Sequence, residues 1–398
     1  MSAELSGVRE EAVELTMDAL VTDMYTTSFT LAYRALMNGG TSQEPGWFAR
    51  PAAEWGEGPF ADRFDLRKIK QGGMNVFGQS MIDQAASTVG YEKARESALS
   101  QGLTRKHADD VVWPEDWAEF AWPPDPWAQY TLQYPPRNGL IDALALYEAL
   151  MREIDAIDEL TLVRCADDIE ATRGGATVGV IFDCNCVQMI DDSLEMLSVL
   201  HRLGYRQMLL ARFSRNLVCD SWVQSRTMGG ITPFGEAVVR EMNRIGMIID
   251  LSHVSDAGVW DVLELSEAPV IFSHSNAREI HFHPRNITDE QIRAIGENGG
   301  VIGLMSLFIG PGDKYRDNES WEVDDPRFER WLDHFDHVVD LAGPEHVGWG
   351  SDGYLVMIGT PAELPKLTEG LMRRGHPEET IRGFLGENHL RVFREVVG

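Results

Sequence analysis

Two histidines and an aspartate follow separate apolar segments, each at the point where a buried strand is expected to end. His253 closes MIIDLSH, His274 closes PVIFSH and Asp352 closes HVGWGSD. The carboxyl ends of parallel strands gather at one rim of a barrel, so these side chains are expected to meet there. Zinc hydrolases commonly use three nitrogen or oxygen ligands and leave a position for water. Each residue alone is weak evidence, because strand-end histidines are often structural and GSDG also suits a turn.

The elements that would position these residues are eight short apolar runs separated by helical patterns. Uninterrupted runs rich in Val, Ile and Leu are typical of strands buried on both faces. The runs cover residues 19–26, 74–79, 177–184, 206–212, 247–253, 269–274, 300–306 and 346–352.

Amphipathic helices are expected in the gaps, over residues 191–204, 233–246 and 288–300. Gly204 closes the first, and Thr288 with Gln291 opens the last as a capping box. Eight strands alternating with helices predict a single α/β domain over 1–398, a (β/α)8 TIM-type barrel. A doubly wound open sheet is the alternative, but no GxGxxG loop follows the first strand.

Residues 101–135 do not fit this alternation, because four tryptophans stand there among five prolines. Proline prevents a long helix, and the aromatic side chains need to be covered. We interpret the segment as an insertion packed on the barrel surface. The alternative is a lid over the catalytic mouth or a subunit contact.

The composition limits the kinds of partner. The formal net charge of −28 and the pI of about 4.7 disfavour nucleic acid. There is no apolar stretch of about 18 residues or more, so we expect no membrane span, and the N-terminal segment lacks the pattern of a signal peptide. Only four cysteines are present, which makes a disulfide framework unexpected. We therefore expect a cytoplasmic protein.

Residues 230–307 contain the stretches DLSHVS, SHSNAR, HPRN and ITDEQIRAIGENGGVIG. These stretches closely resemble the membrane (renal) dipeptidase family of the amidohydrolase superfamily. The segments 64–77, 166–171 and 346–352 resemble other landmarks of that family. The resemblance implies a TIM-type barrel, zinc-dependent cleavage of small amide substrates and a homodimer.

The resemblance also implies roles for individual residues. His253 and His274 match zinc-binding histidines, and Asp352 matches a metal ligand that also shuttles protons. Arg285, the arginine of HPRN, matches the residue that holds the terminal carboxylate of the substrate. A planar guanidinium suits that task because it offers paired donors to a carboxylate. A loop salt bridge is the alternative role for Arg285.

The chain departs from the family at specific positions. The family's first strand carries Asp-Gly-His-Asn-Asp, whose His and final Asp bind one of two metals, whereas residues 23–27 place Tyr25 and Thr27 there. A bridging glutamate is matched by Asn185, and a substrate-contacting histidine by Arg212. We therefore predict at most one zinc ion per chain, with none as the alternative.

A shift of strand 177–184 by one residue would instead present Cys184 and Cys186 to the metal. We disfavour this alternative because free cysteine is among the most buried residue types.

Three hypotheses for function follow. In the first, the protein hydrolyses a carboxylate-bearing dipeptide-like amide, with Asp352 as proton shuttle and Arg212 stabilising the oxyanion. Substrate contacts would come from Arg285, Arg212, Tyr25 and Asn185. Arg212 turned towards Asp183 or Asp220 is the alternative.

The second hypothesis is a metal-free enzyme for an anionic substrate, in which His253, His274 or Tyr25 act as acid and base. The third is a catalytically inactive binding homologue, favoured by the loss of several ligand positions.

Overall fold

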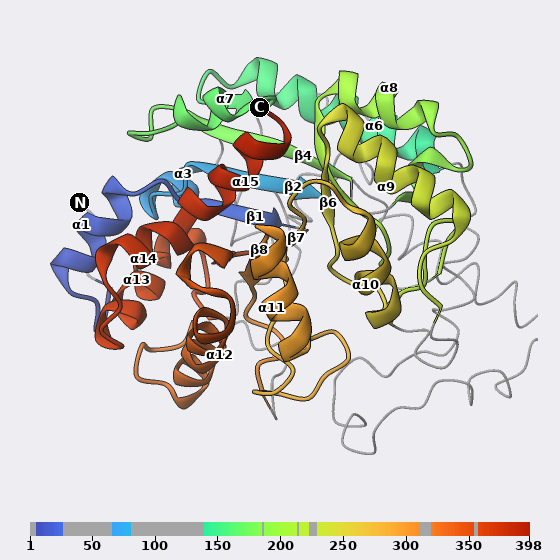
Figure 1. The fold of residues 1–398 in the computed structure, drawn as a ribbon. Coiled ribbons are helices and arrows are strands. Elements are labelled where there is room, and N and C mark those ends of the chain that lie inside the picture. Colours follow the sequence, from blue (N-terminus) through green and yellow to red (C-terminus); the bar gives the residue numbers. More distant parts are fainter. Residues whose placement is uncertain are drawn as a thin grey trace, which may run out of the picture.

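The computed structural model describes residues 5–26, 66–80, 139–184, 187–212, 215–222, 229–310, 320–353 and 357–398. Parallel strands run around a barrel in the order β1-β2-β4-β5-β6-β7-β8-β9 (Figure 1). Their bounds are Thr22–Thr26 (β1), Val76–Ser80 (β2), Val178–Cys184 (β4), Tyr205–Leu209 (β5), Ile248–Asp250 (β6), Ile271–Phe272 (β7), Val301–Leu304 (β8) and Val347–Trp349 (β9). The predicted α/β barrel is therefore confirmed.

The first and last strands approach each other and nearly close the barrel. The backbone N–H of Asp352 donates to the carbonyl of Tyr25 at 2.9 Å. The N–H of Ser351 donates to Asp23 Oδ1 at 2.8 Å. A further strand, β3 (Leu160–Leu162), pairs with β4 outside this path and was not predicted from the sequence.

Helices surround the strands, as Figure 1 shows. The α-helices are α1 (Glu10–Asp18), α3 (Leu66–Gln71), α6 (Gly139–Ala156), α7 (Ala166–Glu170), α8 (Glu195–Leu203), α9 (Pro233–Ile245), α10 (Asp256–Leu265), α11 (Asp289–Asn298), α12 (Pro326–Ala342), α13 (Pro365–Arg373), α14 (Glu378–Arg382) and α15 (Asn388–Val396). The predicted capping box opens α11, where Thr288 and Gln291 exchange hydrogen bonds. Gly204 ends α8 in the left-handed conformation, as predicted.

Apolar side chains from six strands pack together inside the barrel. One buried cluster contains Met24, Val76, Ile181, Ile248, Ile271 and Val301. A second apolar layer lies between the strands and the helices and includes Phe182, Leu200 and Val238. Since apolar side chains fill this part of the interior, the catalytic groups are expected at the carboxyl ends of the strands.

The last five strands of the barrel end earlier than the apolar runs predicted. β6 stops at Asp250 and β7 at Phe272, so His253 and His274 lie in the segments that follow. The predicted insertion at 101–135 lies outside the described residues. Within the described ranges, no helix has the length and apolar character needed to cross a membrane.

Gly350 allows the end of β9 to approach the backbone next to His274. A methyl group added at Gly350 would lie 1.8 Å from the carbonyl oxygen of Ser273. We predict that Gly350→Ala lowers the free energy of unfolding by about 1–3 kcal/mol or more, because the backbone must shift. Urea unfolding would measure the loss. Gly296→Ala is the control, since its nearest neighbour would be 3.1 Å away; equal losses in the two variants would contradict the prediction.

Candidate active site at the carboxyl rim of the barrel

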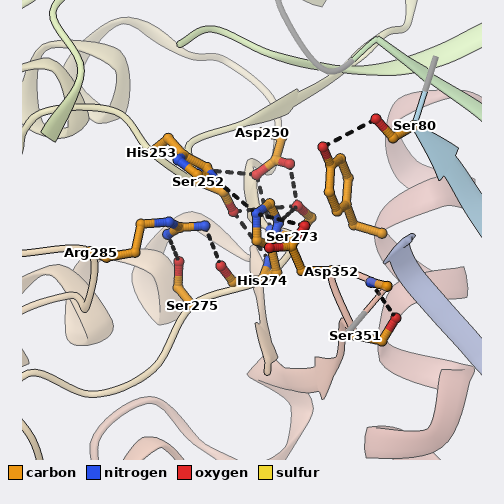
Figure 2. Close-up of polar contacts among 12 residues, drawn as sticks. Ser80, Asp250, Ser252, His253, Ser273, His274, Ser275, Arg285, Ser351 and Asp352 are labelled. Carbon is orange, nitrogen blue, oxygen red and sulfur yellow. Dashed lines mark hydrogen bonds and ion pairs between the residues drawn. The ribbon is translucent and has the colours of Figure 1, made fainter. Parts of the chain in front are cut away.

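The two predicted histidines meet at the centre of the rim. His253 Nε2 and His274 Nε2 lie 3.0 Å apart, and both rings are buried. Figure 2 shows them with Asp250, Ser252 and Ser273 gathered around His274. Burial, with the nearby charge of Arg285, holds the pKa of both histidines well below its usual value, so both rings are neutral at pH 7.

Asp352 lies beside this pair. Its Oδ1 is 4.0 Å from His274 Nε2. Burial raises the pKa of Asp352 to about 6, although the charges of Arg212 and Arg285 oppose the rise. His253 and Asp352 both have left-handed backbones, with φ of 70° and 52°. Such strain in residues other than glycine concentrates at functional sites.

Tyr25, which stands at a family ligand position, packs against His274. The two rings stack with centroids 4.3 Å apart and planes 12° apart. The Tyr25 hydroxyl donates to Ser80 Oγ at 3.2 Å. Tyr25 therefore supports His274 from the side of the first strand. Thr27, Asn185 and Cys186 lie outside the described residues.

The charges of Arg285 and Arg212 affect the same three ionisable groups of the site. Arg285 is buried and donates to the Ser275 hydroxyl at 2.7 Å and to the His274 carbonyl at 2.6 Å (Figure 2). The charges of Arg212 and Arg285 each lower the pKa of His253, His274 and Asp352. The two guanidinium groups therefore lie near one site. Of the alternative partners of Arg212, Asp220 pairs with Arg215 at 3.0 Å.

Three carboxyl groups within the barrel strands are fully buried. Asp250 Oδ1 accepts the backbone N–H groups of Ser252 and Ser273 at 2.9 and 3.0 Å, and Oδ2 bonds the Ser273 hydroxyl. Burial raises the pKa of Asp250. Burial and the charge of Asp250 raise that of Asp183, which accepts a bond from Gln207 at 2.6 Å.

The third is Asp23, whose Oδ1 accepts the N–H groups of Ser351 and Tyr25. Burial nevertheless raises the pKa of Asp23 to about 7.

Sequence reasoning missed Asp183, Asp250 and Trp222 as members of the site. Trp222 Nε1 donates to His253 Nδ1 at 3.2 Å. The acidic residues did leave a signal, since each interrupts an otherwise apolar strand, and a buried carboxylate needs a reason. Trp222 left none, because its role depends on a contact across 31 residues.

The spacing of these donor atoms can be compared with that of a zinc site. Zinc favours imidazole and carboxylate ligands at about 2.0–2.2 Å, which places neighbouring tetrahedral donors roughly 3.3 Å apart. The 3.0 Å between the histidine nitrogens and the 4.0 Å to Asp352 bracket that spacing. Among the described residues, no three His, Cys, Asp or Glu side chains already form a metal-holding group. Cys184 is buried with its sulfur against Met189 Sδ, at 2.8 Å.

A parallel barrel with histidines and a carboxylate at its carboxyl rim fits the amidohydrolase class. A family model described as membrane dipeptidase (peptidase family M19) matches residues 110–397. The chain therefore belongs to the membrane dipeptidase family. Membership makes it a dipeptidase-like hydrolase of small molecules and implies dependence on a metal.

Individual relatives agree with this assignment. Dipeptidase verJ of Clonostachys rogersoniana is 36% identical over 290 residues, which are 68% of this chain and 72% of that protein. Dipeptidase 3 of Rattus norvegicus is 34% identical over 287 residues, 68% of this chain and 55% of the rat protein. The match thus spans just over half of the rat protein's length.

Solved structures show the same fold. A metallopeptidase from Rhodobacter sphaeroides, liganded with a phosphinate mimic of the dipeptide L-Ala-D-Ala, has a TM-score of 0.69 and 24% identity, covering 95% of this chain and 99% of that one. An amidohydrolase from Pseudomonas aeruginosa has a TM-score of 0.65 and 21% identity, covering 97% and 99%.

The raised pKa of Asp23 predicts a pH-dependent stability. Its folded pKa of about 7 exceeds the ordinary 3.8, so the folded state holds the proton more tightly. Its stabilising contribution is complete below pH 4 and is lost as pH rises through 7. Asp23→Asn should remove this loss. As pH rises from 4 to 8, the free energy of unfolding of the variant should increase by up to roughly 4 kcal/mol relative to that of the wild type.

Chemical denaturation at several pH values would measure the difference. Glu264→Gln, on an exposed position of α10, serves as control. Parallel stability curves for wild type and Asp23→Asn would show that Asp23 stays ionised in the folded protein.

Proposed function

We propose that this protein hydrolyses a small dipeptide-like amide that bears a carboxylate, using at most one zinc ion. The observation that carries the proposal is the convergence of His253, His274 and Asp352 beside two arginines. His253 and His274 would hold the ion with Asp352, and the chemistry supplied there is polarisation of the scissile carbonyl and a lower pKa for water. Tyr25 and Thr27 at the family's first-metal positions support a single ion.

The chain's own residues would carry the proton and the charges. Asp352, whose pKa of about 6 leaves it mostly ionised at pH 7, would accept the proton of the attacking water and pass it to the leaving amine. Arg212 would stabilise the oxyanion where the family uses a histidine. Tyr25, which stacks on His274, would contact the substrate, as would Asn185, which lies outside the described residues.

Arg285 would bind the carboxylate of the substrate. Its guanidinium is held by the His274 carbonyl and the Ser275 hydroxyl, so its position is set before a ligand arrives. Two guanidinium groups near one site repel each other unless an anion or acid lies between them. Although the whole chain carries a net charge of −28, the two guanidinium groups would give this site a local positive charge that attracts an anionic ligand.

A second candidate is a metal-free acid–base enzyme on the same barrel. The observation favouring it is the direct His253–His274 hydrogen bond of 3.0 Å, which occupies the nitrogens that a metal would need. The third candidate, an inactive binding homologue, predicts ligand binding without turnover.

Metal analysis separates these candidates. We expect the purified protein to bind about one zinc equivalent per chain, and His274→Ala to lose it, because two imidazoles supply the nitrogen ligands. Plasma mass spectrometry and zinc titration would measure the stoichiometry. His201→Ala, on α8, is the control. Two ions per wild-type chain would refute the single-ion site, and none would favour the metal-free candidates.

The carboxylate requirement is tested by comparing a dipeptide with its amidated counterpart. We expect wild type to prefer the free carboxylate roughly 10- to 100-fold in kcat/KM, the range of charge-assisted hydrogen bonds. Arg285→Ala should abolish this preference, and Arg285→Lys should keep part of it, since lysine lacks the paired donors.

Arg293→Ala, on α11, is the matched control and should leave the preference unchanged. Equal kcat/KM for both substrates in wild type would overturn the proposed carboxylate site.

A further inference from the structure

Trp222, which has no role in the proposed reaction, contacts His253. Its indole Nε1 lies 3.2 Å from His253 Nδ1, and its backbone N–H donates to the His253 carbonyl at 2.9 Å. Its ring also lies against His283, with centroids 5.6 Å apart. These contacts fix the indole next to His253.

The indole N–H determines which atom donates at each step of a hydrogen-bond chain that begins at His253. An indole N–H only donates, so His253 Nδ1 must accept and the neutral ring carries its proton on Nε2. That proton is donated to His274 Nε2, 3.0 Å away. His274 then carries its proton on Nδ1, 2.8 Å from Ser273 Oγ. The Ser273 hydroxyl in turn donates to Asp250 Oδ2.

This direction opposes metal binding. A metal needs the lone pair of His253 Nε2, but that atom holds the proton, and the lone pair of His274 Nε2 accepts it. Ligation requires the His253 proton to move to Nδ1, the atom that faces the Trp222 N–H.

We propose that Trp222 is a positioning residue that holds His253 in the Nε2–H tautomer and thereby weakens zinc binding at the histidine pair. The metal-binding part of this inference rests on the proposed single-zinc site. Zinc uptake then requires loss of the indole hydrogen bond and transfer of one proton from Nε2 to Nδ1 within the same ring. No proton is gained or lost in that exchange.

Trp222→Phe tests the inference, because it keeps an aromatic ring and removes only the N–H donor. We expect zinc to bind roughly two- to tenfold more tightly, the range for one hydrogen bond. Zinc affinity would be measured by competition with a chromogenic chelator. Trp260→Phe, at an indole that is 43% exposed on α10, is the matched control and should leave the affinity unchanged.

Long-range ¹⁵N–¹H spectra of the metal-free protein provide a second readout. His253, assigned with His253→Gln, should show the Nε2–H tautomer in wild type and gain Nδ1–H character in Trp222→Phe. A wild-type Nδ1–H tautomer overturns the inference and needs no variant to fold. Unchanged or weaker zinc binding in a folded Trp222→Phe overturns it as well.

The two proposals fail in different ways. If the wild-type protein is an active zinc hydrolase and its His253 is the Nδ1–H tautomer, only the role of Trp222 is refuted and the zinc function stands. If neither wild type nor Trp222→Phe binds zinc, the single-zinc function fails, and control of zinc affinity by Trp222 fails with it.

Discussion

The rim of the barrel depends on how one buried carboxyl group, Asp250, is satisfied. An ionisable group away from water is costly unless hydrogen bonds surround it. Two backbone N–H groups and the Ser273 hydroxyl meet that need, and Ser273 is thereby left as the acceptor for His274. His274 then fixes its neighbour His253. The side chain that ends a short strand thus orients the groups that would meet the substrate.

The same low-dielectric setting explains the charge distribution of the site. Burial keeps both histidines neutral and raises the pKa values of Asp23, Asp183 and Asp250, because the charged form of each group is disfavoured away from water. The arginines are the cations that act on this region, and they lower the pKa of Asp352 against the effect of burial. These two arginines are the groups that the proposed anionic substrate would meet at the rim of a strongly acidic protein.

The fold was predictable because strands buried on both faces leave continuous apolar runs, and a strand overlaps each of the eight runs. The ends of the strands were not, since a hydrogen-bond ladder can stop before the apolar residues do; β6 ends three residues before His253. β3 has only three residues and left too short a pattern. Barrel geometry brought His253, His274 and Asp352 together as expected, but the contacts of Asp250 and Trp222 cross between elements, which no local pattern encodes.

The closure of the barrel also constrains the order in which the chain can fold. β1 is completed by residues 351 and 352, and α1 packs on α13 through the Thr16–Thr368 hydrogen bond and the ion pair from Arg9 to the buried Glu369. These partners are separated by more than 320 residues. During synthesis β1 therefore waits with one exposed edge until β9 has left the ribosome. An unpaired edge of this kind can join another chain, so newly made protein has a period of vulnerability to aggregation that the finished barrel does not share.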